Sequence, residues 1–137
     1  MKSKFSITWR QSKQPRKQRK YFRNAPLHIR QKLIHANLSK ELREETGRRS
    51  LPVRKGDEIK VLRGKFKGQT GKIIEVDLKK LVAYVDSIKR KRADGKEVHI
   101  PLRPSNLQII NLNMDDKMRV KKFKKKKKES EEKKIKD

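Results

Sequence analysis

Within residues 53–77, apolar and polar residues alternate at residues 58–61, and apolar residues return after a group of glycines. Ile59 and Val61 are separated by a charged residue, and apolar residues resume at 73–76. A period of two is typical of a strand that buries one face. Three glycines lie between the two apolar segments: Gly64, Gly68 and Gly71. The pattern therefore predicts two strands joined by a glycine-rich turn.

Further strands are predicted downstream. Residues 81–86 alternate again, and residues 107–112 form a last apolar segment. Between them, residues 88–100 contain Asp94-Gly95, a dipeptide that favours a tight β-hairpin. Five short strands within about sixty residues predict a mostly β fold, a small SH3-like barrel.

A helical pattern precedes these strands. Apolar residues of segment 25–45 recur at helical spacing, namely Leu27, Ile34, Leu38 and Leu42. Asn37 and Ser39 weaken the middle of the pattern, so we expect the helix to break into two short helices near Asn37. Gly47 is a natural helix stop.

The composition adds a strong positive charge. Lys and Arg number 42 against 16 Asp and Glu, so the formal net charge is +26, and charged residues make up 42% of the chain. So much charge cannot all surround one compact core, and we expect part of the chain to be disordered. Such an excess of cations also needs a polyanionic partner, most simply nucleic acid.

These patterns divide the chain into four parts. Residues 1–24 form a basic N-terminal arm, residues 25–47 a short helical segment, residues 48–112 the barrel, and residues 113–137 a lysine-rich tail. Both ends are predicted to be disordered in the free protein, because neither can bury enough apolar surface to offset the entropy of ordering.

The N-terminal arm carries its own binding chemistry. It contains no acid, and aromatic residues are interleaved with its cations: Phe5, Trp9, Tyr21 and Phe22. On RNA, Arg and Lys neutralise phosphates while an aromatic ring stacks on an unpaired base. The alternatives are a solvated basic tail with incidental aromatics, or a nuclear-localisation signal in residues 15–20.

Cations also surround the predicted turns. Arg63, Lys65, Lys67 and Lys72 lie among the three glycines, where they suit a phosphate backbone that approaches closely. The predicted hairpin at residues 89–96 is similarly basic. The alternative for each turn is a hairpin that faces solvent.

Several other chemistries are disfavoured by the residue types. The chain has no cysteine, which excludes disulfides, Cys-ligated zinc and a thiol nucleophile. Its apolar runs are too short to span a membrane, and no apolar core of a secretory signal follows the N-terminus. His28 and His35 lack a nearby third ligand, so we predict no metal site. We likewise predict no catalytic residue, no cofactor and no small-molecule substrate.

The glycine-rich stretch resembles the KOW motif: Gly56-Asp57, an alternating strand, Gly64, Lys67-Gly68, then Gly71-Lys72 and an apolar strand. The wider sequence resembles the archaeal and eukaryotic branch of a universal family of KOW-containing large-subunit ribosomal proteins. This is the family numbered twenty-four in bacteria and twenty-six in eukaryotes. The further matching features are Ala25-Pro26, His28, Arg30, residues 38–42, Arg49-Ser50, residues 52–57, Ala93-Asp94-Gly95 and Pro104-Ser105-Asn106.

The resemblance covers about residues 12–112 and does not extend to the tail. It implies an SH3-like barrel that binds large-subunit ribosomal RNA near its 5′ region, beside the polypeptide exit tunnel and neighbouring ribosomal proteins. It also implies a part in early subunit assembly, a place in the cytoplasmic ribosome and no enzymatic activity. The short loop at residues 68–71 favours an archaeal source, and Gly47-Arg48-Arg49 departs from the family's usual pattern. A KOW-domain transcription-elongation factor or another RNA-binding factor is the alternative.

Charge and resemblance together predict the RNA-binding residues. The three glycines are expected to allow close approach of the RNA backbone. The side chains expected to contact RNA are Arg10, Lys13, Arg16, Lys17, Arg19, Lys20, Arg23, His28, Arg30, Arg48, Arg49, Arg54, Lys55, Arg63, Lys65, Lys67, Lys72, Lys89, Arg90, Lys91 and Arg92.

Overall fold

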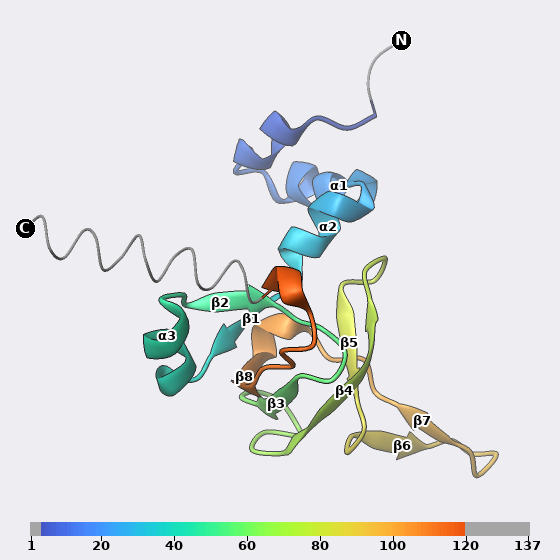
Figure 1. The fold of residues 1–137 in the computed structure, drawn as a ribbon. Coiled ribbons are helices and arrows are strands. Elements are labelled where there is room, and N and C mark those ends of the chain that lie inside the picture. Colours follow the sequence, from blue (N-terminus) through green and yellow to red (C-terminus); the bar gives the residue numbers. More distant parts are fainter. Residues whose placement is uncertain (1–3, 120–137) are drawn as a thin grey trace, which may run out of the picture.

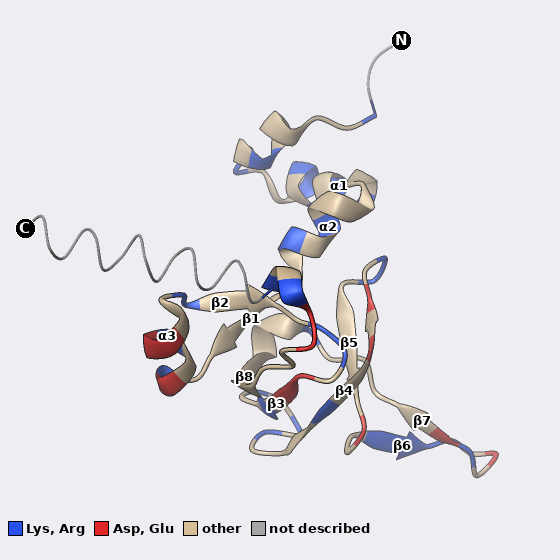
Figure 2. Cartoon of the chain, in the orientation of Figure 1, with Lys and Arg blue, Asp and Glu red and all other residues tan. Residues whose placement is uncertain are grey.

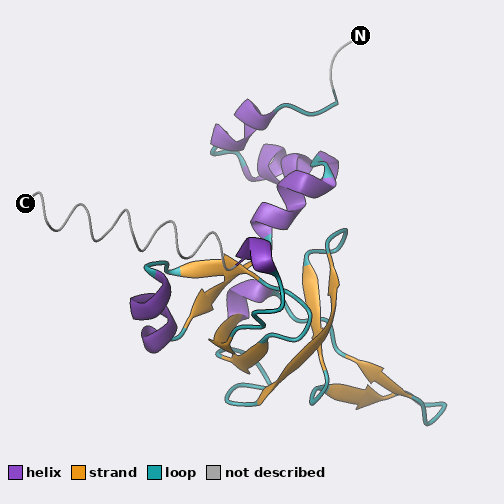
Figure 3. Cartoon of the chain, viewed as in Figure 1, coloured by secondary structure: helices purple, strands orange, loops and turns teal. Residues whose placement is uncertain are grey.

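The computed structural model describes residues 4–119, and strands dominate the part that follows residue 34. Figure 3 shows the N-terminal helices gathered at one end of the molecule and the strands at the other. The mostly β prediction is confirmed, and the sheet is compatible with a small barrel-like domain. Residues 120–137 of the lysine-rich tail, for which disorder was predicted, lie outside the described residues.

The main sheet has six strands in the order β2-β1-β8-β3-β4-β5 (Figure 1). Its strands β1 and β8 pair in parallel, whereas the other neighbours pair antiparallel. The strand bounds are β1 (His35–Leu38), β2 (Ser50–Pro52), β3 (Glu58–Val61), β4 (Thr70–Asp77), β5 (Val82–Val85) and β8 (Leu107–Asn111).

The long strand β4 joins two parts of the sheet. Its first residues pair with β3, and its residues from Ile73 onward pair with β5, with a register shift between Ile73 and Glu75. Such an irregularity bends a strand and increases its twist. The bend encloses a core in which Ile59, Leu107 and Ile109 are fully buried. The period-two pattern that predicted β3 is therefore confirmed as a buried face.

The predicted hairpin is also confirmed. Strands β6 (Lys89–Lys91) and β7 (Glu97–His99) pair antiparallel as a separate two-stranded sheet. Gly95 has a φ of +80°, a left-handed conformation that glycine adopts without steric cost. Figure 1 shows this hairpin projecting from the main sheet.

The helical segment is shorter than predicted. Helix α2 (Leu27–Leu33) and helix α3 (Lys40–Thr46) form, and the predicted break occurs between them. The Ser39 hydroxyl caps α3 by accepting a hydrogen bond from the Leu42 N–H at 3.3 Å. Gly47, with a φ of +62°, ends α3 as predicted.

The prediction of helix is wrong for the segment between α2 and α3. This segment is strand β1, which lies between β2 and β8. Ala36 and Leu38 face the core and are almost fully buried, whereas His35 is exposed. Pairing with strands distant in sequence outweighs the local helical spacing, because it satisfies the backbone and buries both apolar side chains.

The structure also differs from the predicted disorder of the N-terminal arm. Residues 4–24 contain the 3-10 helix η1 (Ile7–Gln11) and the helix α1 (Pro15–Asn24). Tyr21, Ala25 and Ile29 are spaced four residues apart and bury one another in a small cluster. The Phe5 ring packs on Tyr21 with the ring centroids 4.9 Å apart. This second core stabilises the helices that the charge pattern alone disfavours.

The start of the C-terminal tail is also ordered. Arg119 is 5% exposed, and its guanidinium donates two hydrogen bonds to the fully buried Asp57 carboxylate, at 2.6 and 2.9 Å. The backbone N–H groups of Arg54 and Asn113 donate to the same carboxylate, each at 2.9 Å. Residues 113–119 therefore pack onto the sheet instead of forming a disordered tail.

Candidate nucleic-acid interface

Apart from Arg48, Arg49, Arg54, Lys55 and Lys72, the predicted RNA-binding residues lie on three separate surfaces. We name these the N-terminal helical unit (residues 4–34), the β3–β4 loop (residues 62–69) and the β6–β7 hairpin (residues 89–99). Figure 2 shows the helical unit at one end of the molecule and the loop and hairpin at the other. Because the surfaces lie apart, the cations do not form one compact patch.

Most of the predicted residues are exposed. The exposed side chains are Arg10, Lys13, Arg16, Lys17, Arg19, Lys20, Arg23, His28, Arg49, Lys55, Arg63, Lys65, Lys67, Lys72, Lys89, Arg90, Lys91 and Arg92. The N-terminal helical unit has no acid of its own, since the first acidic residue of the chain is Glu41. Its cations therefore have no counter-charge within the unit.

The β3–β4 loop presents its cations from a backbone of defined conformation. Gly64 and Gly68 have φ values of +95° and +90°, and the space beside each α-carbon is open. The Gly68 N–H donates to the Val61 carbonyl at 2.8 Å, and Phe66 packs against the sheet core. The loop therefore projects Lys65 and Lys67 into solvent from a fixed backbone.

Gly71 has a different role from the other two glycines. A β-carbon at this position would lie within 2.6 Å of side-chain atoms of Val85, Asp86 and Ser87. The chain's own turn after β5 occupies the space that we expected RNA to approach. The glycine is required because β4 and this turn pack closely.

Replacing Gly71 with alanine should lower the free energy of unfolding by about 1–3 kcal/mol through overpacking. The neighbouring atoms cannot easily move, because Asp86 accepts from the Lys72 N–H at 2.9 Å and Ser87 donates to the Thr70 carbonyl at 2.8 Å. Urea unfolding measures the change. Thr70→Ala, at the exposed neighbouring position, is the control, and equal stability of the two variants would contradict the packing argument.

Some side chains that were predicted to contact RNA make contacts within the protein. Arg30 donates to the carbonyls of Ala25 and Arg23 and to that of Lys79 across the chain. Arg54 forms an ion pair with Asp116. The backbone N–H of Met118, together with Arg54, lowers the pKa of Asp116 below its ordinary value of 3.8.

Other predicted cations have weaker internal partners. The Lys72 Nζ lies 3.5 Å from the Glu58 Oε1, and the Lys89 Nζ lies 3.5 Å from the Glu97 Oε2. Both are exposed pairs, which contribute little to stability. Arg48 is half-buried, with no hydrogen-bond partner for its Nε.

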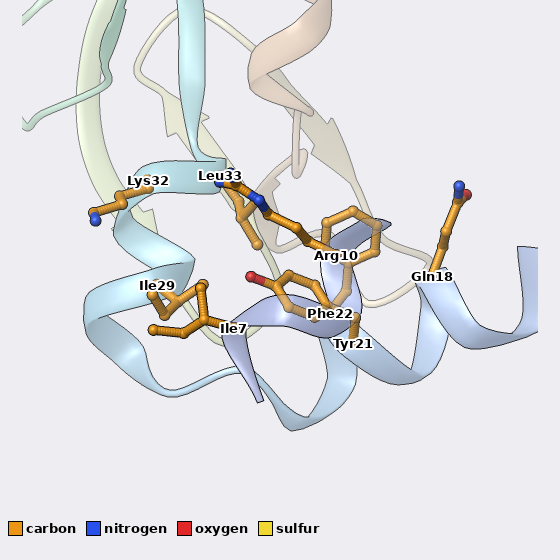
Figure 4. A pocket seen from close by; sticks show the side chains of 8 residues that line it. All are labelled: Ile7, Arg10, Gln18, Tyr21, Phe22, Ile29, Lys32 and Leu33. Carbon is orange, nitrogen blue, oxygen red and sulfur yellow. The ribbon is translucent and has the colours of Figure 1, made fainter. Parts of the chain in front are cut away.

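The N-terminal helical unit also contains a cavity of about 530 Å³ (Figure 4). Helices η1, α1 and α2 line it with Ile7, Arg10, Gln18, Tyr21, Phe22, Ile29, Lys32 and Leu33. In Figure 4 the Arg10 side chain reaches from η1 toward Leu33 of α2, and Gln18 stands apart at the edge. Lys32 was not among the residues predicted from the sequence, although it follows the buried Ile29 by one helical turn.

His28 and His35 line a smaller cavity of about 220 Å³ beside Arg48, Arg54 and Arg119. Within residues 4–119, no group of three potential metal-binding side chains comes together. In the same part of the chain, no helix is long and apolar enough to cross a membrane.

Comparisons with known proteins agree with this basic, strand-rich architecture. A family of ribosomal proteins, described as L26 in eukaryotes and as the L24 type in archaea, matches residues 12–126. The large ribosomal subunit protein uL24 of Methanothrix thermoacetophila is 53% identical over 112 residues, which cover 82% of this chain and 97% of the relative. The chain belongs to this ribosomal protein family. Its members are structural constituents of the large subunit in the cytoplasmic ribosome, not enzymes.

The family match also corrects one expectation. It runs to residue 126, whereas the resemblance read from the sequence stops near residue 112. The extension includes Arg119, whose buried contact with Asp57 joins the start of the tail to the sheet.

Proposed function

We propose that the chain binds large-subunit ribosomal RNA with the exposed cations of its three surfaces. The observation that carries this proposal is the N-terminal helical unit, where an ordered fold displays cations and no acid. Such a surface repels itself unless a polyanion neutralises it. Two further surfaces face other directions, so the protein is suited to being surrounded by RNA.

The sheet has a complementary role. We propose that it is an SH3-like KOW barrel whose β3–β4 loop and β6–β7 hairpin contact the phosphate backbone. Fixed loops give cations a defined spacing, and phosphate contacts of this kind set the position of a protein on RNA. Family membership further supports a part in early subunit assembly and a position near the polypeptide exit tunnel, beside neighbouring ribosomal proteins.

The test is co-sedimentation of the tagged full chain from a cell extract. We expect it to travel with large ribosomal subunits and to protect a segment of their RNA from nuclease. Sedimentation with RNA polymerase instead would support the alternative, a KOW-domain transcription-elongation factor. The family match favours the ribosomal outcome.

Replacing Lys65 and Lys67 with alanine separates binding from folding at the β3–β4 loop. Both side chains are exposed, so the free energy of unfolding should change by no more than ~0.5 kcal/mol. Affinity for ribosomal RNA and incorporation into large subunits should both fall, because two phosphate contacts are lost. Thermal melting and competition against wild type measure the two effects.

The matched control is Lys79→Ala with Lys80→Ala, which removes two exposed lysines from the β4–β5 turn. These residues lie outside the predicted RNA contacts. If the β3–β4 loop variant melts normally and competes as well as wild type, then the loop is only a scaffold turn and the RNA contacts lie elsewhere.

A further inference from the structure

The cavity in the N-terminal helical unit combines three features. It has an apolar floor, because Tyr21 and Ile29 are 7% and 6% exposed. It has an open aromatic wall, because Phe22 remains 42% exposed. It also has cationic edges, supplied by Arg10 from η1 and Lys32 from α2.

The open apolar surface needs an occupant. Ile7 is 55% exposed and lines the same cavity as Phe22 and the buried Tyr21 and Ile29. Apolar groups left open in this way typically mark a binding surface. The volume of about 530 Å³ falls within the usual range of roughly 300–1,000 Å³ for small-ligand pockets.

The surrounding charge identifies the occupant. Every charged side chain of residues 4–34 is a cation, so the cavity opens onto a strongly positive surface. A partner suited to this site must join a flat apolar group to negative charge. An unpaired nucleotide does so, because its base is flat and aromatic and its phosphates are anionic.

We propose that this cavity receives one unpaired nucleobase of the bound RNA. This inference rests on the proposed RNA-binding function and adds a site of defined chemistry to it. The Phe22 ring stacks on the base, and Tyr21 and Ile29 form the floor beneath it. Arg10 and Lys32 bind the phosphates on either side of the flipped nucleotide.

The arrangement explains why the helical unit is folded and not merely charged. A disordered cationic arm neutralises phosphates equally well, but it cannot hold the Phe22 ring in a fixed position relative to Tyr21 and Ile29. The Phe5–Tyr21 contact and the packing of Ala25 on Ile29 set the cavity's shape. The small core therefore positions the stacking residue.

The test compares Phe22→Ala with wild type in the full chain. The probes are a ribosomal RNA fragment with unpaired loops and a fully paired duplex of equal length. Stacking contributes a factor of about 5 to 150 in affinity per base. Phe22→Ala should lose affinity by this factor on the loop-bearing RNA and should bind the duplex as wild type does. The slope of log affinity against log salt should be unchanged, because no charge is removed.

Three further variants sharpen the comparison. Phe22→Tyr keeps a stacking ring and should bind as wild type does, whereas Phe22→Leu keeps an apolar side chain without a flat face and should bind weakly. Ile110→Ala, on β8, removes an apolar side chain that is 41% exposed and should have no effect. Circular dichroism checks that α1 persists in each variant.

Two outcomes would overturn the nucleobase site and leave the proposed function intact. One is equal affinity of Phe22→Ala and wild type for the loop-bearing RNA. The other is a pair of results: Phe22→Leu binds the loop-bearing RNA as wild type does, and only Phe22→Ala is defective in subunit incorporation. This pair would indicate that the cavity receives an apolar side chain of another protein. If the wild-type chain binds neither RNA, then the proposed function itself fails.

Discussion

Replacing Asp57 with asparagine should lower the free energy of unfolding by about 3–5 kcal/mol, because the change leaves Arg119 as a buried charge without a partner. The Asp57 carboxylate is completely buried, and four hydrogen bonds from Arg54, Asn113 and Arg119 reach its two oxygens. An amide is neutral and offers only one acceptor oxygen. Urea unfolding monitored by circular dichroism measures the loss.

The double variant tests the coupling. Arg119→Met together with Asp57→Asn should lower the free energy of unfolding by less than the sum of the two single changes. Each single change leaves one buried charge without a partner, whereas the double variant leaves none. Glu97→Gln breaks the exposed pair with Lys89 and should cost less than ~1 kcal/mol. Additive single costs would mean that residues 113–119 do not hold Asp57 in solution.

Affinity for ribosomal RNA should fall steeply as salt rises. Each phosphate neutralised by Lys or Arg contributes about 0.7–0.9 to the slope of log affinity against log salt. With about 6–10 such contacts, affinity should fall by about 10³–10⁵ between about 50 and 200 mM salt. Filter binding across a salt series measures the slope. A slope near one or two would show that the cations are mostly solvated.

Charge removal from α1 locates part of this slope. Replacing Arg16, Lys17, Arg19 and Lys20 with glutamine removes four exposed cations from one helix. The slope should decrease by roughly 0.7–0.9 for each of these that contacts a phosphate. The control replaces Lys40 and Arg43 of α3, a helix that also carries three acids and is outside the predicted contacts. Equal changes in slope per cation removed would mean that binding depends on net charge alone.

The strands after residue 57 were predictable from local pattern. Buried and exposed residues alternate in β3, so a period of two appears directly in the sequence. The glycines mark the β3–β4 loop and the hairpin turn, because positive φ values occur at Gly64, Gly68 and Gly95. In these places the local preference of the chain and the final fold agree.

Strand β1 shows why part of the sheet was missed. Ile34, Ala36 and Leu38 alternate in the sequence with polar residues, and this signal was present. Leu38 also continues a helical spacing toward Leu42, so a short segment fits both periods. The choice between them depends on β2 and β8, which lie far away in sequence.

For the candidate interface, the sequence by itself determined three properties: the large excess of positive charge, the absence of acidic residues before Glu41, and the presence of aromatic residues among the cations. These properties are set by composition and order, and folding does not change them. The tertiary structure alone decided which cations remain free. Arg30 and Arg54 turn inward to protein partners, while Lys65 and Lys67 stay exposed.

The tertiary structure likewise decided the two contacts between distant parts of the chain. Asp57 and Arg119 are 62 residues apart, and no local pattern indicates that they meet. The cavity needs η1, α1 and α2 to pack together, which the spacing of Tyr21, Ala25 and Ile29 suggests only once a helix is assumed. Burial of a few apolar side chains is a cooperative property of the folded chain. The composition therefore gives the number of cations, but it does not give the position of the cavity between them.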